Sequence, residues 1–141
     1  MTERFVSSGK DVTLPIRDLI TKPVRGIVHV GAHRCEEFRE YTEALRVPVK
    51  HIHWFEANPE LASAMRKPGW NVTSAIVCDV HGGQQTLNVT NNVQSSSILQ
   101  LGTHAQEHPH VKYVRQIKNR TLRLDKHFTK EQMRDLNFLN I

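Results

Sequence analysis

Short apolar runs alternate with polar, helix-forming segments in the first half of the chain. The runs Gly26–Val30 and His51–Glu56 are only a few residues long, which is typical of buried strands. Between them, Cys35–Leu45 repeats apolar residues at the spacing of one helix face. The pattern therefore predicts a strand–helix–strand unit, and with it an α/β fold built on a parallel sheet.

The remaining pattern predicts further elements of both kinds. Asn58, Pro59 and Glu60 have the residue types of a helix N-cap, first position and first turn, so a helix is expected over Pro59–Lys67. Residues 1–23 form a lead-in, in which Val12–Ile20 suits one short helix or strand. The other expected elements are strands at Asn71–Cys78 and Thr86–Thr90, a long strand at Lys112–Leu124, a short helix at Asp125–Leu136 and a final strand at Asn137–Ile141.

Composition narrows the class of protein only slightly. The 141 residues fit one domain, here residues 24–141 after the lead-in. No apolar run approaches the roughly 18 residues that span a bilayer, and the N-terminus lacks the apolar core of a signal peptide. Cys35 and Cys78 lie far apart and form no Cys-x-x-Cys pair. These features predict a reduced, cytoplasmic protein.

The formal charge of +5 permits an anionic partner. Basic residues concentrate in one segment, at Lys112, Arg115, Lys118, Arg120 and Arg123. If this segment is a strand, Arg115 and Lys118 face opposite sides, so the charges form no single stripe. A strand protected by charge is the first interpretation, and contact with nucleic acid is the alternative.

A glycine turn and an acid stand at corresponding ends of the two first strands. Gly31 directly follows the first strand, and a residue without Cβ allows a sharp turn and a close approach by a ligand. Free N–H groups at the start of the following helix are expected to point over this turn. Glu56 ends the second strand, close to the spacing of a ribose-binding acid in nucleotide-binding folds.

The glycine pattern favours a cofactor without phosphates. The turn Gly31–Glu36 has only one glycine, whereas a dinucleotide-binding fingerprint has three. A pyrophosphate would therefore be cramped here. S-adenosylmethionine, which carries an adenosine but no phosphate, is the cofactor that this chemistry favours, and an ordinary glycine turn of an α/β protein is the alternative.

The order of several motifs resembles that of a known family. VHVGAHRCEEFREY, HWFEANPEL, AIVCDVHGGQQTLNVTNNVQSSSIL, HPHV, TLRLDKHF and NFLNI follow one another from about residue 24 to the end. In this order and spacing they resemble the FkbM-type S-adenosylmethionine-dependent methyltransferases. The resemblance implies a class I methyltransferase fold, which is a Rossmann-like, mostly parallel sheet with flanking helices. It also implies O-methylation of a hydroxyl group on a sugar or another small molecule.

The resemblance assigns cofactor contacts residue by residue. It implies that Gly31, Ala32 and His33 form the turn under the methionine portion, and that Glu56 binds the ribose hydroxyls. Ala57 and Asn58 would lie beside the adenosine, Ala75 near the adenine, and Gln94, Ser95 and Ser96 in a polar loop near the reaction centre. Asp125 matches an acid of the family that suits a helix cap.

Two departures from the family pattern stand out. Cys35 occupies a position where many class I enzymes have a further glycine, so a less open turn is expected. The sequence also stops after NFLNI, before the Asp-x-x-Gly segment of the family. This predicts the N-terminal part of a methyltransferase domain, truncated at the start of strand four.

Several functional points stay open at this level. His33, His104, His108 and His110 are all candidate bases for the hydroxyl proton, and no pattern selects one. The pairs His51/His53 and His104/His108 could each share one face, but neither has a cysteine or acid at a recognised zinc spacing, so no metal is expected. A homodimer is an open alternative, because an incomplete sheet that exposes its first strand favours association. The competing function is a catalytically inactive, methyltransferase-like module that binds an anionic partner such as RNA.

Overall fold

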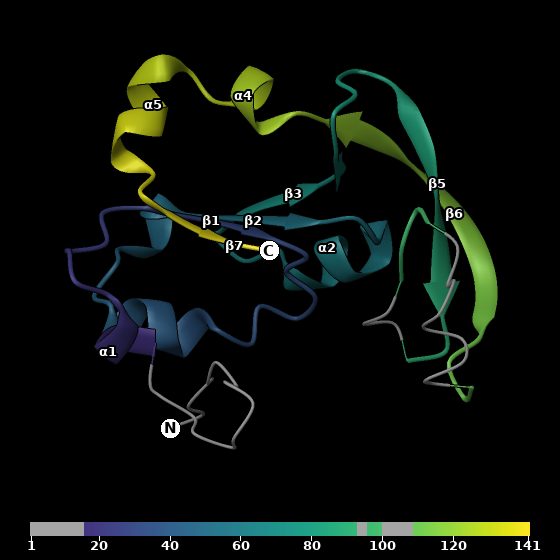
Figure 1. The fold of residues 1–141 in the computed structure, drawn as a ribbon, viewed down its shortest axis with the longest axis horizontal. Coiled ribbons are helices and arrows are strands. Elements are labelled where there is room, and N and C mark those ends of the chain that lie inside the picture. Colours follow the sequence, from purple (N-terminus) through teal and green to yellow (C-terminus); the bar gives the residue numbers. More distant parts are fainter. Residues whose placement is uncertain (1–15, 93–95, 100–108) are drawn as a thin grey trace.

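Two sheets organise residues 16–92, 96–99 and 109–141, the part of the chain that the computed structural model describes (Figure 1). The larger sheet has four parallel strands in the spatial order β3–β2–β1–β7. Their bounds are Asn71–Ser74 for β3, Ile52–Glu56 for β2, Ile27–Val30 for β1 and Phe138–Asn140 for β7. Strand order thus reverses at β1, an arrangement consistent with a Rossmann-like fold.

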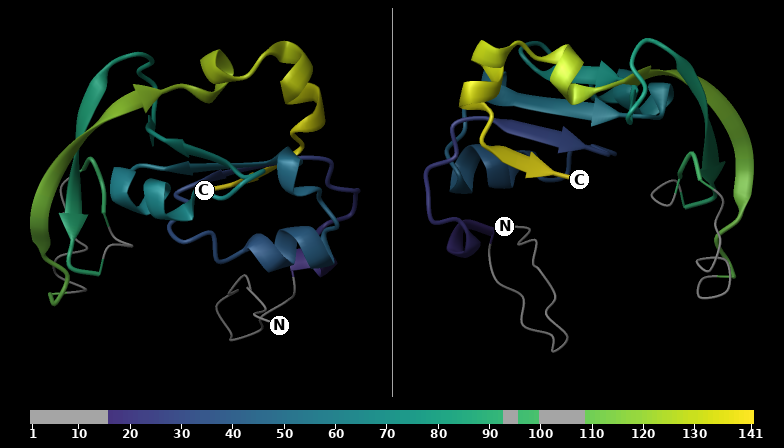
Figure 2. Two further views of the ribbon diagram at one scale, coloured as in Figure 1. Left: turned by 180° about the vertical axis from the view of Figure 1, so that it is seen from behind. Right: turned by 45° about the horizontal axis from the view of Figure 1, so that its top comes forward.

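Helices flank both faces of this sheet. On one side lie α1 (Ile16–Leu19) and a π-helix (Glu40–Ala44), and on the other lie α4 (Leu124–His127) and α5 (Lys130–Asp135), as Figures 1 and 2 show. Two further elements adjoin β2, a 3₁₀-helix before it and α2 after it. They span Val49–His51 and Pro59–Met65.

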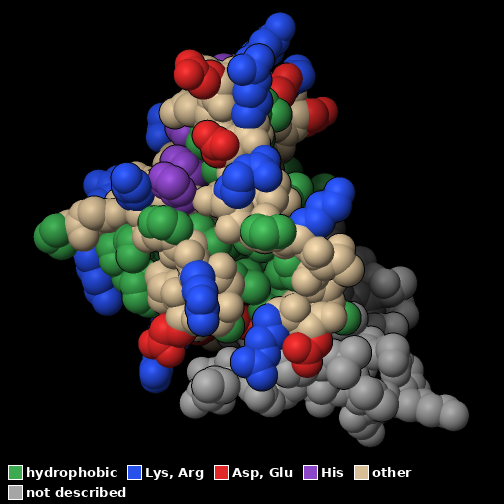
Figure 3. Space-filling view, turned by 90° about the vertical axis from the view of Figure 1, so that its left-hand side faces the viewer, with side chains coloured by type: hydrophobic (Ala, Val, Ile, Leu, Met, Phe, Trp, Pro, Cys, Tyr) green, Lys and Arg blue, Asp and Glu red, His purple; other side chains and the backbone are tan. Residues whose placement is uncertain are grey.

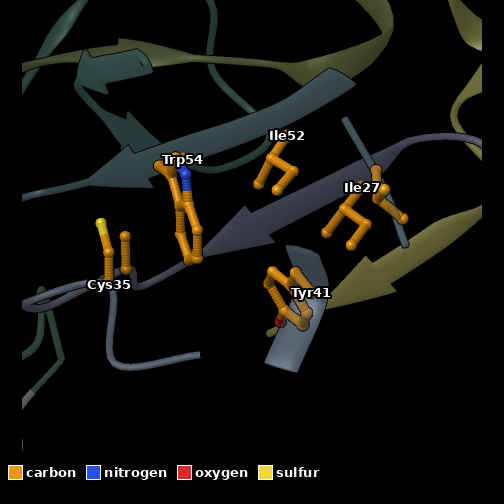
Figure 4. Packing of buried hydrophobic residues seen from close by; sticks show 7 residues of the cluster. Ile27, Cys35, Tyr41, Ile52 and Trp54 are labelled. Carbon is orange, nitrogen blue, oxygen red and sulfur yellow. The ribbon is translucent and has the colours of Figure 1, made fainter. Parts of the chain in front are cut away.

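Aromatic residues fill the face of the sheet on the side of the π-helix (Figure 4). Trp54 of β2 and Tyr41 of the π-helix are fully buried and stack with ring centroids 5.4 Å apart. Ile27 and Ile52, which are also fully buried, pack beside them. Burying a large apolar side chain stabilises a fold by about 1.5–3 kcal/mol, so this layer is a principal source of stability.

The opposite face of the sheet holds a second cluster. Val28 and Phe55 alternate along their strands with the residues of the first cluster and pack against Leu122 and Phe128. Phe128 lies between α4 and α5, so its burial fastens both helices to the sheet. Apolar residues on successive positions of β1 and β2 are explained by this burial on two sides.

The second sheet is built around a long hairpin that curves away beside the first sheet (Figure 2). Its strands β5 (Gln84–Thr90) and β6 (Tyr113–Leu122) pair antiparallel. The short strand β4 (Ile76–Val77) adds to β6 in parallel. Because β4 follows β3 almost directly, the hairpin is joined to the end of the parallel sheet.

Most of the predicted elements are confirmed. The strands expected at Gly26–Val30, His51–Glu56 and Asn137–Ile141 correspond to β1, β2 and β7, and the two hairpin strands are present. The predicted start of α2 is also confirmed, because the side chain of Asn58 accepts a hydrogen bond from the N–H of Glu60 at 3.0 Å.

Two predicted elements are each divided in the structure. The strand expected over Asn71–Cys78 breaks at Ala75, because its first half pairs with β2 and its second half with β6. The helix expected over Asp125–Leu136 breaks before Thr129, which forms a capping box with Gln132 and starts a separate helix. In both cases a local pattern continues across a point where the pairing or the cap changes.

The helix expected over Cys35–Leu45 is confirmed only in part: its first residues form turns, and helical structure begins at Phe38 and continues as the π-helix. Two smaller expectations are wrong. Asp125 is not a cap, since Arg123 holds that position and Asp125 pairs with the Arg123 guanidinium at 2.7 Å. Finally, β1 is not an exposed edge, because it lies between β2 and β7.

Candidate functional site

The turn after β1 has the backbone conformation that a glycine was expected to provide. Gly31 has a φ of 78°, in the left-handed region that side chains disfavour. Its N–H and that of Ala32 both donate to the carbonyl of Phe55, at 2.9 and 3.0 Å. The turn is therefore tied to the end of the neighbouring strand β2.

The expectation of free N–H groups over this turn is wrong for His33, Arg34 and Cys35. The N–H of His33 donates to Glu56 Oε2 at 2.7 Å, and that of Arg34 donates to Glu36 Oε2 at 3.1 Å. The N–H of Cys35 donates to the carbonyl of Ala32. Because the successive N–H groups of the turn have acceptors within the protein, the turn offers no ready cradle for a phosphate.

Glu56 joins the two loops that leave β1 and β2. One carboxylate oxygen accepts from His33 in the glycine turn, and the other accepts from the N–H of Asn58 at 2.8 Å. The residue is 8% exposed. Each carboxylate oxygen has a second lone pair, so the same side chain can still accept a hydrogen bond from a ligand hydroxyl.

A pocket of about 330 Å³ opens where the strand order reverses, at the carboxyl ends of β1 and β7. Gly31 and His33 line it on the side of the glycine turn, and Asn140 lines it on the side of β7. Ligands of open α/β sheets bind in the crevice at this point of the topology. Its size is at the lower end of the range for pockets that hold small molecules.

Acidic groups dominate the charge of this pocket. Glu36 and Glu37 line it, and none of the described lining residues is Lys or Arg. Burial acts to raise the pKa of the Glu36 carboxyl, but the hydrogen bond and charge of His33, together with backbone hydrogen bonds, outweigh that effect and hold the pKa below its ordinary value. The His33 Nδ1 to Glu36 Oε1 distance is 2.6 Å. A cationic ligand group is favoured here, and an anionic one is disfavoured.

Sequence reasoning missed a largely buried polar cluster beside the pocket. His29 Nδ1 lies 3.0 Å from the Tyr41 hydroxyl and 3.9 Å from Glu37 Oε2. Asn140 Nδ2 donates to the same hydroxyl at 2.6 Å. His29, Glu37 and Asn140 all line the pocket. The available signal was a histidine within the apolar run of β1, because such a polar residue requires partners when buried.

The structure brings only some of the predicted contact residues together. Gly31, Ala32, His33 and Glu56 meet around the glycine turn, and Ala57 follows Glu56 directly. Ala32 is itself buried and makes its contact through the backbone. These residues form one continuous group at the carboxyl ends of β1 and β2.

The other predicted contacts lie away from this group or have structural roles. Asn58 is buried as the cap of α2, and Ala75 is buried where β3 gives way to β4. Ser96 belongs to the hairpin, where its Oγ accepts from the N–H of Thr90 at 3.2 Å. Gln94 and Ser95 lie outside the described residues.

Of the four candidate bases, His33 lies in the pocket. His110 is next to β6, where its carbonyl accepts from the Asn91 side chain. His104 and His108 lie outside the described residues. No choice of base follows from this arrangement, although it leaves His33 as the candidate nearest the glycine turn.

Cys35 is a poor nucleophile in this setting. Burial, together with the charge of nearby Glu37, raises the pKa of its thiol to about 12. Its φ of 55° is in the left-handed region that favours glycine. The side chain packs in the aromatic cluster near Trp54, which accounts for a residue larger than glycine at this strained position (Figure 4).

The arginines of the basic segment 112–123 make hydrogen bonds or ion pairs within the protein. The Arg115 guanidinium binds both carboxylate oxygens of Glu60, at 2.8 and 2.6 Å. Arg120 donates to the carbonyl of Ser74, and Arg123 pairs with Asp125. Figure 3 shows the side of the molecule away from the hairpin, and on that face Lys and Arg side chains are scattered rather than gathered into one patch.

Within residues 16–92, 96–99 and 109–141, no three His, Cys, Asp or Glu side chains are grouped to hold a metal ion. In the same part of the chain, no helix has the length and apolar character needed to cross a membrane.

Comparisons with protein-family models, with curated proteins and with solved structures found no match for this chain.

Proposed function

We propose that this chain carries the cofactor site of an S-adenosylmethionine-dependent methyltransferase that O-methylates a hydroxyl group on a sugar or another small molecule. The observation that carries the proposal is the acidic pocket beside Gly31, at the point where strand order reverses between β1 and β7. The motif order gives the class of acceptor, through its resemblance to FkbM-type enzymes.

The charge of the pocket supports this cofactor over a dinucleotide. S-adenosylmethionine carries a sulfonium and an ammonium group against a single carboxylate, so it is a net cation, and its two cationic groups are ones that Glu36 and Glu37 would attract. A pyrophosphate would meet the same acids without a Lys or Arg among the described lining residues. It would also lack the backbone donors of residues 31–35, because these N–H groups are bound within the protein.

The residues present suit distinct parts of the cofactor. The lack of a side chain at Gly31 allows close approach, Glu37 and Asn140 suit the amino-acid end, and Glu56 suits the ribose hydroxyls. A bound cofactor would supply an electrophilic methyl group for in-line displacement by the acceptor oxygen. The contribution of the chain is then to hold the nucleoside and the amino-acid end in fixed positions.

Isothermal titration of S-adenosylhomocysteine into wild type and Glu56→Gln tests the role of Glu56. The substitution removes the charge and turns an amide N–H₂ toward one of two backbone N–H donors. Loss of a charged hydrogen bond costs about 1.5–3 kcal/mol, so the affinity should fall at least about tenfold.

Glu43→Gln is the matched control, because it changes an exposed acid that pairs with Arg39 on the helical segment. It should leave the affinity unchanged. Equal affinities of wild type and Glu56→Gln would contradict the assignment of the ribose to Glu56. An equal loss of affinity in Glu56→Gln and Glu43→Gln would show that the overall charge of the protein, rather than Glu56 itself, determines binding.

The alternative function, a binding module for an anionic partner such as RNA, has less support. Arg115, Arg120 and Arg123 make contacts within the protein. Measurement of RNA binding at two salt concentrations separates the alternatives, since phosphate contacts weaken steeply as salt rises. Tight, salt-sensitive binding without any affinity for S-adenosylhomocysteine would favour the module.

A further inference from the structure

One face of β6 contacts the segments that leave β2 and β3. Arg115, Ile117 and Asn119 alternate along the strand and therefore share this face. Arg115 binds Glu60 in α2, and Ile117 packs in a cluster that includes Ala57. The hairpin is thus fastened beside the loop in which Glu56 is followed by Ala57 and Asn58.

Asn119 contacts both of these segments. Its Nδ2 donates to the carbonyl of Ala57 at 2.8 Å and to Ser74 Oγ at 2.9 Å. Its Oδ1 accepts from the N–H of Arg120. Glu56 and Ser74 are partners in the register of β2 and β3, so one amide bridges the ends of two neighbouring strands.

The peptide bond between Ala57 and Asn58 is consequently held at both ends. Its carbonyl accepts from Asn119, and its N–H donates to Glu56 Oε1 at 2.8 Å. A peptide unit is planar, so fixing the carbonyl also fixes the direction of the N–H. The orientation of that N–H in turn sets one of the two hydrogen bonds that orient the Glu56 carboxylate.

We propose that Asn119 is a positioning residue for the nucleoside half of the cofactor site, acting through the Ala57–Asn58 peptide on Glu56. The inference rests on the proposed function. It assigns to the hairpin, which is distant in sequence from the glycine turn, the task of holding the ribose acid in place.

Asn119→Asp tests this role with almost no change of shape. Aspartate keeps the acceptor but replaces the donor with an oxygen that faces the Ala57 carbonyl. The Ser74 hydroxyl can donate to the new carboxylate, but the hydrogen bond to the Ala57 carbonyl is lost. The affinity for S-adenosylhomocysteine should fall about tenfold, the equivalent of that one hydrogen bond. The affinity for adenosine should fall by the same factor, because both ligands contain the nucleoside.

Asn71→Asp is the matched control. Asn71 is also half-buried and its Nδ2 also donates to a carbonyl, that of Lys50 at 2.8 Å. It lies at the amino end of β3, whereas Asn119 contacts the carboxyl end. The control should lower the melting temperature without changing either affinity.

A double-mutant cycle with Glu56→Gln provides a readout that a merely structural role would not produce. If Asn119 acts through Glu56, Asn119→Asp should weaken binding little further when Glu56→Gln is already present. Additive losses in the cycle, an unchanged affinity of Asn119→Asp, or equal losses in Asn119→Asp and Asn71→Asp would each overturn the inference. Failure of the wild-type chain to bind either ligand would instead overturn the proposed function on which it rests.

Discussion

The contacts that hold the parallel sheet together differ in kind from those that attach the β5–β6 hairpin to it. In the sheet, fully buried Trp54 and Tyr41 stack beneath strands that are covered on both faces. The hairpin has its own small apolar cluster, but polar side chains make its closest contacts with the end of the sheet, through Arg115, Asn119 and Arg120.

This difference indicates that one set of contacts determines the stability of the fold and the other determines where the loop after β2 lies. Burial of apolar area is large and without direction, so it holds the sheet together but specifies orientation weakly. Hydrogen bonds contribute less net free energy but require defined geometry. Substitutions in the sheet should therefore act mainly on folding, and substitutions on β6 should act mainly on the placement of the loop after β2.

The largest expected effect is in the sheet. Trp54→Ala should lower the free energy of unfolding by about 3–5 kcal/mol, the range for removing a buried aromatic side chain. Urea denaturation measures the loss. Trp54→Phe should cost less, because within the described residues the buried indole N–H has no acceptor to lose. Equal losses in the two variants would contradict the stacking account.

A smaller effect is expected at the glycine turn. Gly31→Ala places a side chain at a φ of 78° and should cost about 1–2 kcal/mol of stability. Gly69→Ala is the control, because Gly69 has a φ of 80° and, like Gly31, open space around an added Cβ. Calorimetry should show similar stability losses, and titration should show weaker S-adenosylhomocysteine binding only in Gly31→Ala. Equal affinities would argue against a ligand close to this turn.

Two histidines should make the packing of α4 and α5 sensitive to acid. Burial, with the nearby His127 and His51, lowers the pKa of His53 below its ordinary value of 6.5. Burial, with Arg120 and His81, lowers the pKa of His127 in the same way. The unfolded chain then binds protons more readily than the folded one, so stability is fully present above about pH 6.5 and declines as the pH falls.

Urea unfolding at about pH 7.5 and pH 5.5, on either side of the ordinary histidine pKa, measures this decline. A variant with His53→Gln and His127→Gln should lose less stability between the two values than wild type does. An identical decline in both proteins would assign the acid sensitivity to carboxylates instead.

The smallest effect is expected from the ion pair on the hairpin. The side chains of Arg115 and Glu60 are 44% and 65% exposed, so solvent screens their attraction. A double-mutant cycle of Arg115→Met and Glu60→Gln should give a coupling close to the error of the unfolding measurement. A coupling as large as the loss in Gly31→Ala would show that this pair stabilises the hairpin substantially.

The local sequence pattern predicts much of the parallel sheet but little of how the hairpin is attached to it. Apolar runs and the cap at Asn58 reveal β1, β2 and α2, because those signals lie within a few residues. The break at Ala75 depends on pairing with β6, more than 40 residues away in sequence. No local pattern reports such a partner.

The candidate site shows the same limit. Gly31 and Glu56 are recognisable because a turn and a strand end demand particular residue types. The cluster of His29, Glu37 and Asn140 is not, because β7 brings Asn140 beside β1 only in the folded chain. The free N–H groups were expected from a regular helix start, and the left-handed residues His33 and Cys35 replace that start with a closed turn.

Titration of wild-type protein with S-adenosylhomocysteine and, in parallel, with NAD⁺ tests the proposed cofactor site. Both ligands contain adenosine, but only NAD⁺ brings a pyrophosphate to the acidic pocket and the closed turn. We expect saturable, micromolar binding of S-adenosylhomocysteine and no heat of binding with NAD⁺. Preference for NAD⁺, or no binding of S-adenosylhomocysteine, would overturn the assignment of this pocket to S-adenosylmethionine.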